Sequence, residues 1–521
     1  MDLASARDES RDKQDMLLRT FISHATYLGI IFSSANLYAI TLEEATYTAI
    51  NNSPTVRQAI AKYREDVQNT EISRHSGFYP SIDLAAGTGK ERTYADSGIS
   101  EDVTLTRREL SLSLTQPLFD GFATTYDVKR LNSEAESDRW SALVSVENTA
   151  LSVAQVYANV LRYRELVALA DLNLETHNRI YSQIKLKSDS GVGRQSDLSQ
   201  ITARLAKAYS NRLAAVNNLR DAESNYKNTV GELPPKDMIY PVPDKTLLPK
   251  DLNDAIEQSL AKNPSVEGSK WDIKATEHFK KSVEGSKYPT INFVVERTWN
   301  KNIDGSEGPD EDLQAMIRLN YNLYNGGNYK RNKEVAVQQI AQASEIRRQT
   351  LRDTELTVRL AWAAYEATTG QKEHIKEYVV ATKESQVAYE KQFRLGRRTL
   401  LDLLDSENEL FEARQDYVNA DYDELFSEFR LFNAKGDLMT AFRIYRPPLL
   451  GFEDHFDSEP AALKNQSPSE ELKAAESSVQ PSESILKNTG PKPTAPAKKE
   501  NEKSLEEQLF LDSDEQSGGW Q

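Results

Sequence analysis

The tetrapeptide Leu-Phe-Asp-Gly at residues 118–121 returns 205 positions later as Leu-Tyr-Asn-Gly at residues 323–326. Asp197 and Asp402 have the same spacing, although they lie in a different part of the chain. One offset that is kept across separate motifs indicates an internal duplication, because chance matches would not stay collinear.

The duplication sets the domain organisation. Ser-Pro-Thr-Val at residues 53–56 corresponds to Asn-Pro-Ser-Val at residues 263–266, with an offset of 210 positions. We therefore interpret residues 40–232 and residues 248–445 as two structural repeats, joined by a proline-rich linker at residues 233–247. Each repeat is predicted to contain a helix, a β-hairpin and two long helices.

The predicted hairpins alternate apolar and polar residues. Residues 110–115 read Leu-Ser-Leu-Ser-Leu-Thr, residues 313–323 show the same pattern, and partner strands are expected after the Tyr-Pro pairs at residues 79–80 and 288–289. Period-two alternation gives each strand one apolar face. Strands of about ten residues suit a tilted strand that crosses a bilayer, and half-buried soluble hairpins are the alternative.

Four strands from one chain cannot close a barrel. An open sheet edge in lipid leaves backbone groups without hydrogen-bond partners. We therefore expect the strands of several chains to combine, and three chains would supply twelve strands around a lumen.

The helices after each hairpin are predicted to be very long. Residues 124–188 contain neither glycine nor proline, so this helix approaches ~100 Å at ~1.5 Å per residue. Apolar residues also recur every seven positions on the last helix of the second repeat: Leu404, Phe411, Val418, Leu425 and Phe432. Such a seam is typical of coiled-coil packing.

The two ends of the chain differ from the repeats. Residues 1–39 resemble a signal peptide, with a short apolar stretch that ends on the small residue Ala39, and a buried amphipathic helix is the alternative. Residues 446–521 are rich in Ser, Pro, Glu and Lys, so they are predicted to form a disordered tail with no packing surface.

Composition excludes several functions. The 521 residues carry 64 basic and 80 acidic side chains, and a net charge of -16 disfavours nucleic-acid binding. The absence of cysteine excludes disulfides, thiolate metal sites and a cysteine nucleophile. The six histidines show no ligand spacing and no phosphate-binding glycine loop appears, so we predict no catalytic site, no metal and no cofactor.

Taken together, these motifs resemble the TolC family of outer-membrane channel-tunnels over about residues 40–445. The resemblance rests on the duplicated order, the Tyr-Pro strand starts, the strand ends, and the helix turns at residues 191–198 and 395–405. The Gly-Arg-Ser-Asp character of the first turn is most similar to the branch that serves type I secretion.

The resemblance implies a mainly α fold with a membrane β-barrel. A homotrimer would form a twelve-stranded barrel in the outer membrane, continued by a long α-helical coiled-coil barrel in the periplasm. It implies an export duct that passes an unfolded protein, with a periplasmic adaptor and an inner-membrane ABC or other transporter as partners. A small-molecule efflux duct is one alternative, and a soluble periplasmic coiled-coil scaffold is another.

Two aspartates are candidates for a constriction. Asp402 and Asp405 are three residues apart near a helix start, so their carboxylates share one face, and three chains would bring six together. The resemblance assigns them to an acidic ring at the periplasmic entrance. The alternative is that they favour the helix dipole and face water.

The resemblance also implies a gate. Arg398 would bond to Ser196 and Asp197 of a neighbouring helix end and so hold the tube closed. The planar guanidinium suits this role because it can hold a carboxylate with two hydrogen bonds. Phe393 stands where a tyrosine is expected, so one hydroxyl of the lock is missing.

Overall fold

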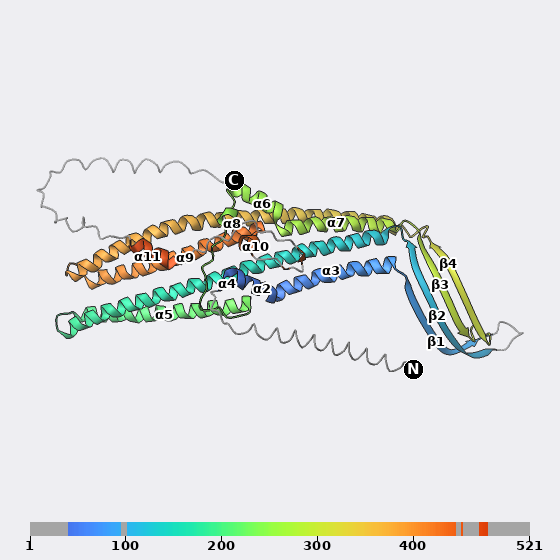
Figure 1. Cartoon of the computed structure of the whole chain (residues 1–521), viewed down its shortest axis with the longest axis horizontal. Coiled ribbons are helices and arrows are strands. Elements are labelled where there is room, and N and C mark those ends of the chain that lie inside the picture. Colours follow the sequence, from blue (N-terminus) through green and yellow to red (C-terminus); the bar gives the residue numbers. More distant parts are fainter. Residues whose placement is uncertain (1–39, 95–101, 444–446, 448–449, 452–467, 478–521) are drawn as a thin grey trace, which may run out of the picture.

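The chain forms a long rod with a sheet at one end and two helical hairpins at the other (Figure 1). The computed structural model describes residues 40–94, 102–443, 447, 450–451 and 468–477. The signal peptide predicted at residues 1–39 therefore lies outside the described residues. No helix in these ranges combines the length and the apolar character that a membrane crossing needs.

The two repeats have the same order of elements. The first contains α2 (Leu42–Asn52), α3 (Pro54–Phe78), β1 (Ser81–Thr93), β2 (Val103–Phe119), α4 (Ala123–Asp189) and α5 (Gln195–Val230). The second contains α6 (Leu252–Lys262), α7 (Pro264–Gly285), β3 (Thr290–Lys301), β4 (Pro309–Asn320), α8 (Asn328–Arg394) and α9 (Leu400–Lys435). A short 3₁₀ helix (Lys245–Leu247), α10 (Leu438–Ala441) and α11 (Pro468–Ser477) complete the list.

Two helices precede each hairpin, where one was predicted. The break falls at Pro54 in the first repeat and at Pro264 in the second. Proline has no N–H for the preceding turn but is well placed at the first position of a helix. The side chains of Ser53 and Asn263 cap the new helices, and Ser53 accepts a hydrogen bond from the Val56 N–H. The sequence match at these positions therefore marks a helix restart.

The four strands form one antiparallel sheet in the order β1-β2-β3-β4, as the alternation predicts. Strands β1 and β4 lie at its edges, where Ile82 and Leu84 are 68% exposed and Ile317 is 70% exposed. Edge strands with exposed apolar side chains favour pairing with another strand. One chain thus supplies a segment of a sheet with two open edges.

Helices α4 and α8 have 67 residues each, so each extends for roughly 100 Å at 1.5 Å per residue. Their partners α5 and α9 have 36 residues each and form the two hairpins with them. The seven-residue seam predicted on α9 is buried at all five positions, between 0% and 7% exposed. The predicted long helices and their packing are therefore confirmed.

The Leu-Phe-Asp-Gly motif lies at the junction between the sheet and α4. Gly121 has a φ of +71°, and a Cβ there would lie 2.2 Å from the carbonyl oxygen of Gly285. Only glycine permits this approach, because it has no Cβ and tolerates a positive φ. A Cβ added at the equivalent Gly326 would have open space around it, with no heavy atom of another part of the chain within 4 Å. The two copies of the motif therefore differ in their surroundings.

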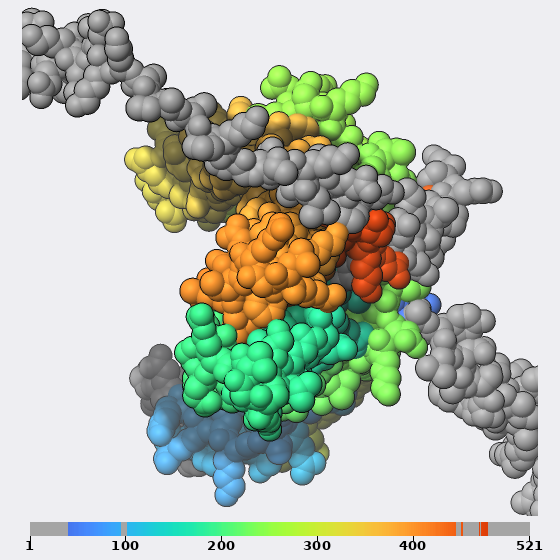
Figure 2. Space-filling model, turned by 90° about the vertical axis from the view of Figure 1, so that its left-hand side faces the viewer, coloured from blue at the N-terminus to red at the C-terminus, as the bar shows by residue number. Residues whose placement is uncertain are grey.

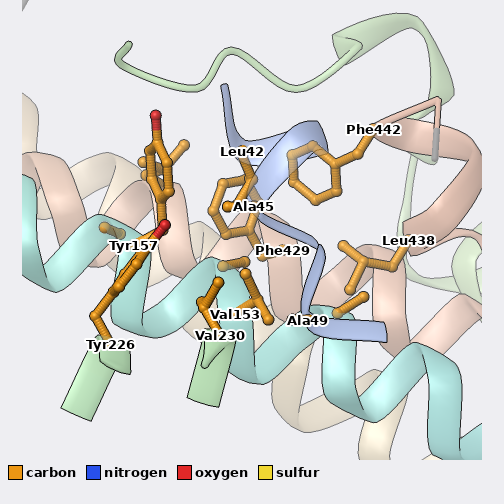
Figure 3. Close-up of a cluster of buried hydrophobic side chains, with 14 of the residues drawn as sticks. Leu42, Ala45, Ala49, Val153, Tyr157, Tyr226, Val230, Phe429, Leu438 and Phe442 are labelled. Atoms are coloured by element: carbon orange, nitrogen blue, oxygen red, sulfur yellow. The ribbon is translucent and has the colours of Figure 1, made fainter. Parts of the chain in front are cut away.

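The core lies midway along the rod, where helices of both repeats meet (Figure 3). The hydroxyl of Tyr157 on α4 is 2.8 Å from the Ile40 carbonyl oxygen and 2.7 Å from the Ile239 carbonyl oxygen. It also accepts a hydrogen bond of 3.0 Å from the Ile239 N–H. Ile40 and Met238 form a parallel bridge. Tyr157 thus connects the start of the first repeat and the linker to α4.

The prediction of a disordered tail is wrong at residues 468–477. These residues form α11, which lies against α8 and α9, and Leu472 is 4% exposed. The prediction used the average composition of the tail, which does not reveal a short amphipathic segment with one buried leucine between acidic residues. The described part of the tail therefore has a packing surface.

We expect Tyr157→Phe to lower the free energy of unfolding by about 1–3 kcal/mol, because buried backbone groups lose their hydrogen-bond partner. Thermal or denaturant unfolding of the purified protein measures the change. The control is Tyr163→Phe, a partly buried tyrosine of the same helix that packs against the same cluster. Equal effects of the two substitutions would contradict the clamp.

Candidate gate and constriction

The candidate residues gather at the helical end of the rod, opposite the sheet (Figure 1). One turn joins α4 to α5 and the other joins α8 to α9. Gly191 and Gly396 have φ values of +75° and +72° in these turns, a conformation that glycine adopts without strain. This requirement accounts for the two glycines that the duplication places 205 residues apart.

The two hairpin ends of one chain lie side by side (Figure 2), and an apolar cluster packs them together. Its buried members come from both repeats: Ile180, Ile184, Ile201, Leu400, Leu403 and Leu404. Leu404 is fully buried. Because the cluster spans α4, α5 and α9, the two hairpin ends of a chain are held as one unit.

Asp402 completes a capping box at the start of helix α9, whose N-cap residue is Thr399. Its Oδ2 atom accepts hydrogen bonds from the Thr399 N–H at 3.0 Å and the Thr399 hydroxyl at 2.8 Å, and its own N–H donates to that hydroxyl. The hydroxyl and N–H of Thr399 lower the pKa of Asp402. The side chain is still 34% exposed. Asp402 therefore stabilises the helix start, as the dipole alternative expects, and also presents a charge to solvent.

Asp405 is paired with the first repeat. Its Oδ1 atom accepts a hydrogen bond of 2.6 Å from Nη2 of Arg204 on α5. Arg179 on α4 approaches Glu390 on α8 to 3.4 Å in a second ion pair between the repeats. Neither arginine follows from the sequence motifs, because the pairing depends on how the helices face one another. The only signal in the sequence is the opposite charge.

Arg398 contacts residues of its own hairpin. Its Nε atom donates to Oε1 of Gln392 at 3.0 Å, and its guanidinium lies 4.5 Å from the centre of the Tyr389 ring. The Asp402 carboxylate is 3.9 Å from Nη1. These contacts leave the Arg398 side chain 39% exposed at the end of the rod.

Ser196 and Asp197 lie together in the other turn, with 3.4 Å between the Ser196 hydroxyl and Asp197 Oδ1. Neither is in the contacts of Arg398 within the described residues of one chain. The predicted lock is thus not formed inside a chain, and a contact between chains stays a prediction. Phe393 packs partly buried against the apolar cluster, with the Lys187 ammonium 5.4 Å from its ring centre.

The site contains no arrangement for metal chemistry. Within the described ranges, no group of three or more His, Asp or Glu side chains is placed to hold a metal ion.

A family model described as outer membrane efflux protein matches residues 45–232 and 255–437, which together are more than half of the chain. The two matched segments coincide closely with the two repeats. Each begins near its first helix and ends near the end of its last long helix.

Known proteins show the same similarity. The outer membrane efflux protein BepC of Brucella suis is 24% identical, over 82% of this chain and 92% of its own. The alkaline protease secretion protein AprF of Pseudomonas aeruginosa is 21% identical, over 80% and 88%. The crystal structure of the CmeC outer membrane channel of Campylobacter jejuni matches with a TM-score of 0.66 and 14% identity, over 84% and 89%. This structural likeness shows the fold.

Leu404→Ala is expected to destabilise the packing of the hairpin ends by about 2–5 kcal/mol, because the substitution removes a large side chain from a packed cluster. Hydrogen exchange should rise at residues 180–204 and 395–410. Leu401→Ala is the matched control, because Leu401 is 46% exposed on the same helix. If both variants exchange as the unaltered protein does, the cluster does not hold the ends together.

Proposed function

The chain belongs to the outer membrane efflux protein family, and from this premise we propose that three copies form one export duct. Members of this family are non-enzymatic ducts of the outer membrane, so the soluble scaffold is no longer an alternative. The duct joins a barrel of twelve strands in the outer membrane to a helical tunnel in the periplasm.

The open edges of the sheet are the observation that carries this proposal. Strand β1 pairs only with β2, and β4 only with β3, among the described strands. Joining β4 of one chain to β1 of the next closes the sheet and satisfies both edges. The open surroundings of Gly326 support the same arrangement, because the equivalent Gly121 is packed against Gly285.

We propose that the carboxylates at the hairpin ends form a ring in the trimer. Arg204 pairs with Asp405 in each chain, so it offsets part of that charge. Asp402 keeps one oxygen atom outside its helix cap. That oxygen lies 3.9 Å from Nη1 of Arg398, which offsets part of that charge as well, so the ring attracts cations through both aspartates.

We propose that Arg398 of one chain bonds to Ser196 and Asp197 of its neighbour when the duct is closed. Arg398 is 39% exposed, and its contacts inside the chain leave donors of its guanidinium available. One exposed ion pair contributes only ~0–1 kcal/mol. Three symmetric copies act together, and the apolar cluster makes each hairpin end move as a unit.

The cargo is proposed to be an unfolded protein, driven by an inner-membrane transporter and delivered through a periplasmic adaptor. The similarity to the alkaline protease secretion protein AprF and the first helix turn support type I secretion. Small-molecule efflux is the second candidate, because the relative BepC is an efflux protein. Secretion of a protein substrate by cells that lack this gene would favour the second candidate.

Thr399→Val should shift the loss of cation selectivity to higher pH. The Thr399 hydroxyl lowers the pKa of Asp402, so Asp402 keeps its charge until the pH falls below the ordinary value of 3.8. Without the hydroxyl the pKa rises and Asp402 is neutralised sooner. Reversal potentials in planar bilayers, measured as the pH is lowered, report the shift. Thr399→Ser keeps the hydroxyl and serves as the control, and the same pH profile in both variants would contradict the role of Asp402.

Arg398→Ser and Asp197→Ala should each raise single-channel conductance in planar bilayers, because each removes one side of the proposed lock. Arg397→Ser is the control, since it removes a neighbouring exposed charge of the same turn. Conductance equal to the unaltered channel in both lock variants would show that another contact closes the duct. The absence of any channel activity in the unaltered protein would contradict the duct itself.

A further inference from the structure

Helix α11 lies across α8 and α9, far along the chain from either (Figures 1 and 2). Glu476 accepts two hydrogen bonds from Arg414 of α9, from Nε at 2.7 Å and from Nη2 at 2.5 Å. Both side chains are largely buried: that of Arg414 is 17% exposed and that of Glu476 is 11% exposed. Glu471 accepts a hydrogen bond of 2.6 Å from the Lys376 ammonium of α8. The two glutamates thus bridge both helices of the hairpin.

Leu472 occupies the space between the two ion pairs. It is 4% exposed and belongs to one apolar cluster with residues of α8 and α9: Val379, Leu410, Ala413 and Tyr417. This surface, the α11 face, therefore combines an apolar strip with a cation at each end. Its complement is a short helix with the pattern acidic, apolar, acidic, as Glu471, Leu472 and Glu476 provide.

The contacts of α11 are few for a permanent part of the fold. It has ten residues, fewer than the ~12–15 that an isolated helix needs to be marginally stable in water. Leu472 and Pro468 are the two apolar residues buried among its described side chains. The chain connects it to Gly451 through residues 452–467, so its binding is intramolecular and is favoured by a high effective concentration. A free helix with better contacts can compete at that site.

We propose that the α11 face is an exchangeable binding site for the acidic amphipathic helix of a partner protein, and that α11 is its tethered occupant. The partner binds by displacing α11, with its own acidic side chains on Lys376 and Arg414. Four heptad residues of α9 (Phe411, Val418, Leu425 and Phe432) pack in the central cluster with the first repeat, so they do not depend on α11. The contacts of α11 with this site come from the same chain, from Lys376 of α8 and Arg414 of α9.

A nitroxide spin label tests the exchange in the full-length protein. The chain has no cysteine and Lys473 is exposed on α11, so Lys473→Cys gives one labelling site that makes no docking contact. We expect the electron paramagnetic resonance spectrum of an ordered helix. A synthetic peptide of residues 466–479 should convert it, in a saturable manner, to the spectrum of a mobile label. A label that is mobile from the start, or ordered at every peptide concentration, would overturn the proposal.

Charge reversal provides the matched control. A peptide with Glu476→Arg should need a concentration at least about tenfold higher for half conversion, because it opposes Arg414. In protein with Arg414→Glu and Glu476→Arg, the label should again be ordered, and the reversed peptide should become the better competitor. If both peptides compete equally with both proteins, displacement is nonspecific and the site is not built for acidic helices.

Discussion

The backbone N–H and C=O groups along the outer edges of β1 and β4 pair with no other described strand of the chain. Unpaired backbone groups raise the free energy of the sheet in lipid, because no water is present there to replace the missing hydrogen bonds. The edges also carry exposed apolar side chains such as Leu84 and Ile317, which suit a membrane and not water. The same chain places helices of roughly 100 Å behind the sheet, so closing the sheet also brings the helices together into a tube.

The two repeats of one chain are similar in their elements but not identical in their contacts. Each repeat supplies two strands and one long hairpin, but the surroundings differ at equivalent places. Gly121 is packed where Gly326 is open, and Asp197 stands in the turn of α5 where Asp402 caps α9. Equivalent positions of the two repeats therefore have different contacts within one chain. At the helical end of the rod, the apolar cluster around Leu404 packs the two hairpin ends of one chain together.

Much of the fold follows from the sequence, because it depends on periodicity. Alternation located the strands, the heptads on α9 located a buried seam, and the shared offset located both turns. The pairing of Arg204 with Asp405 could not be predicted, since it depends on the rotation of two helices that are distant in sequence. Helix α11 was not predicted because it has only ten residues within a long polar tail. A helix this short depends on its contacts with α8 and α9 for stability. The role of Asp402 as a helix cap follows from Thr399 three residues before it.

Cross-linking of the two sheet edges tests the central claim most directly. Leu84 and Ile317 are exposed on β1 and β4, and the chain has no cysteine of its own, so Leu84→Cys with Ile317→Cys places one thiol at each edge. A short bismaleimide that spans adjacent strands, about 4.8 Å apart, should join the chains in outer membranes into a covalent trimer. Either single variant should give none. Only monomers, or a ladder that continues beyond three chains, would contradict a closed barrel of three copies.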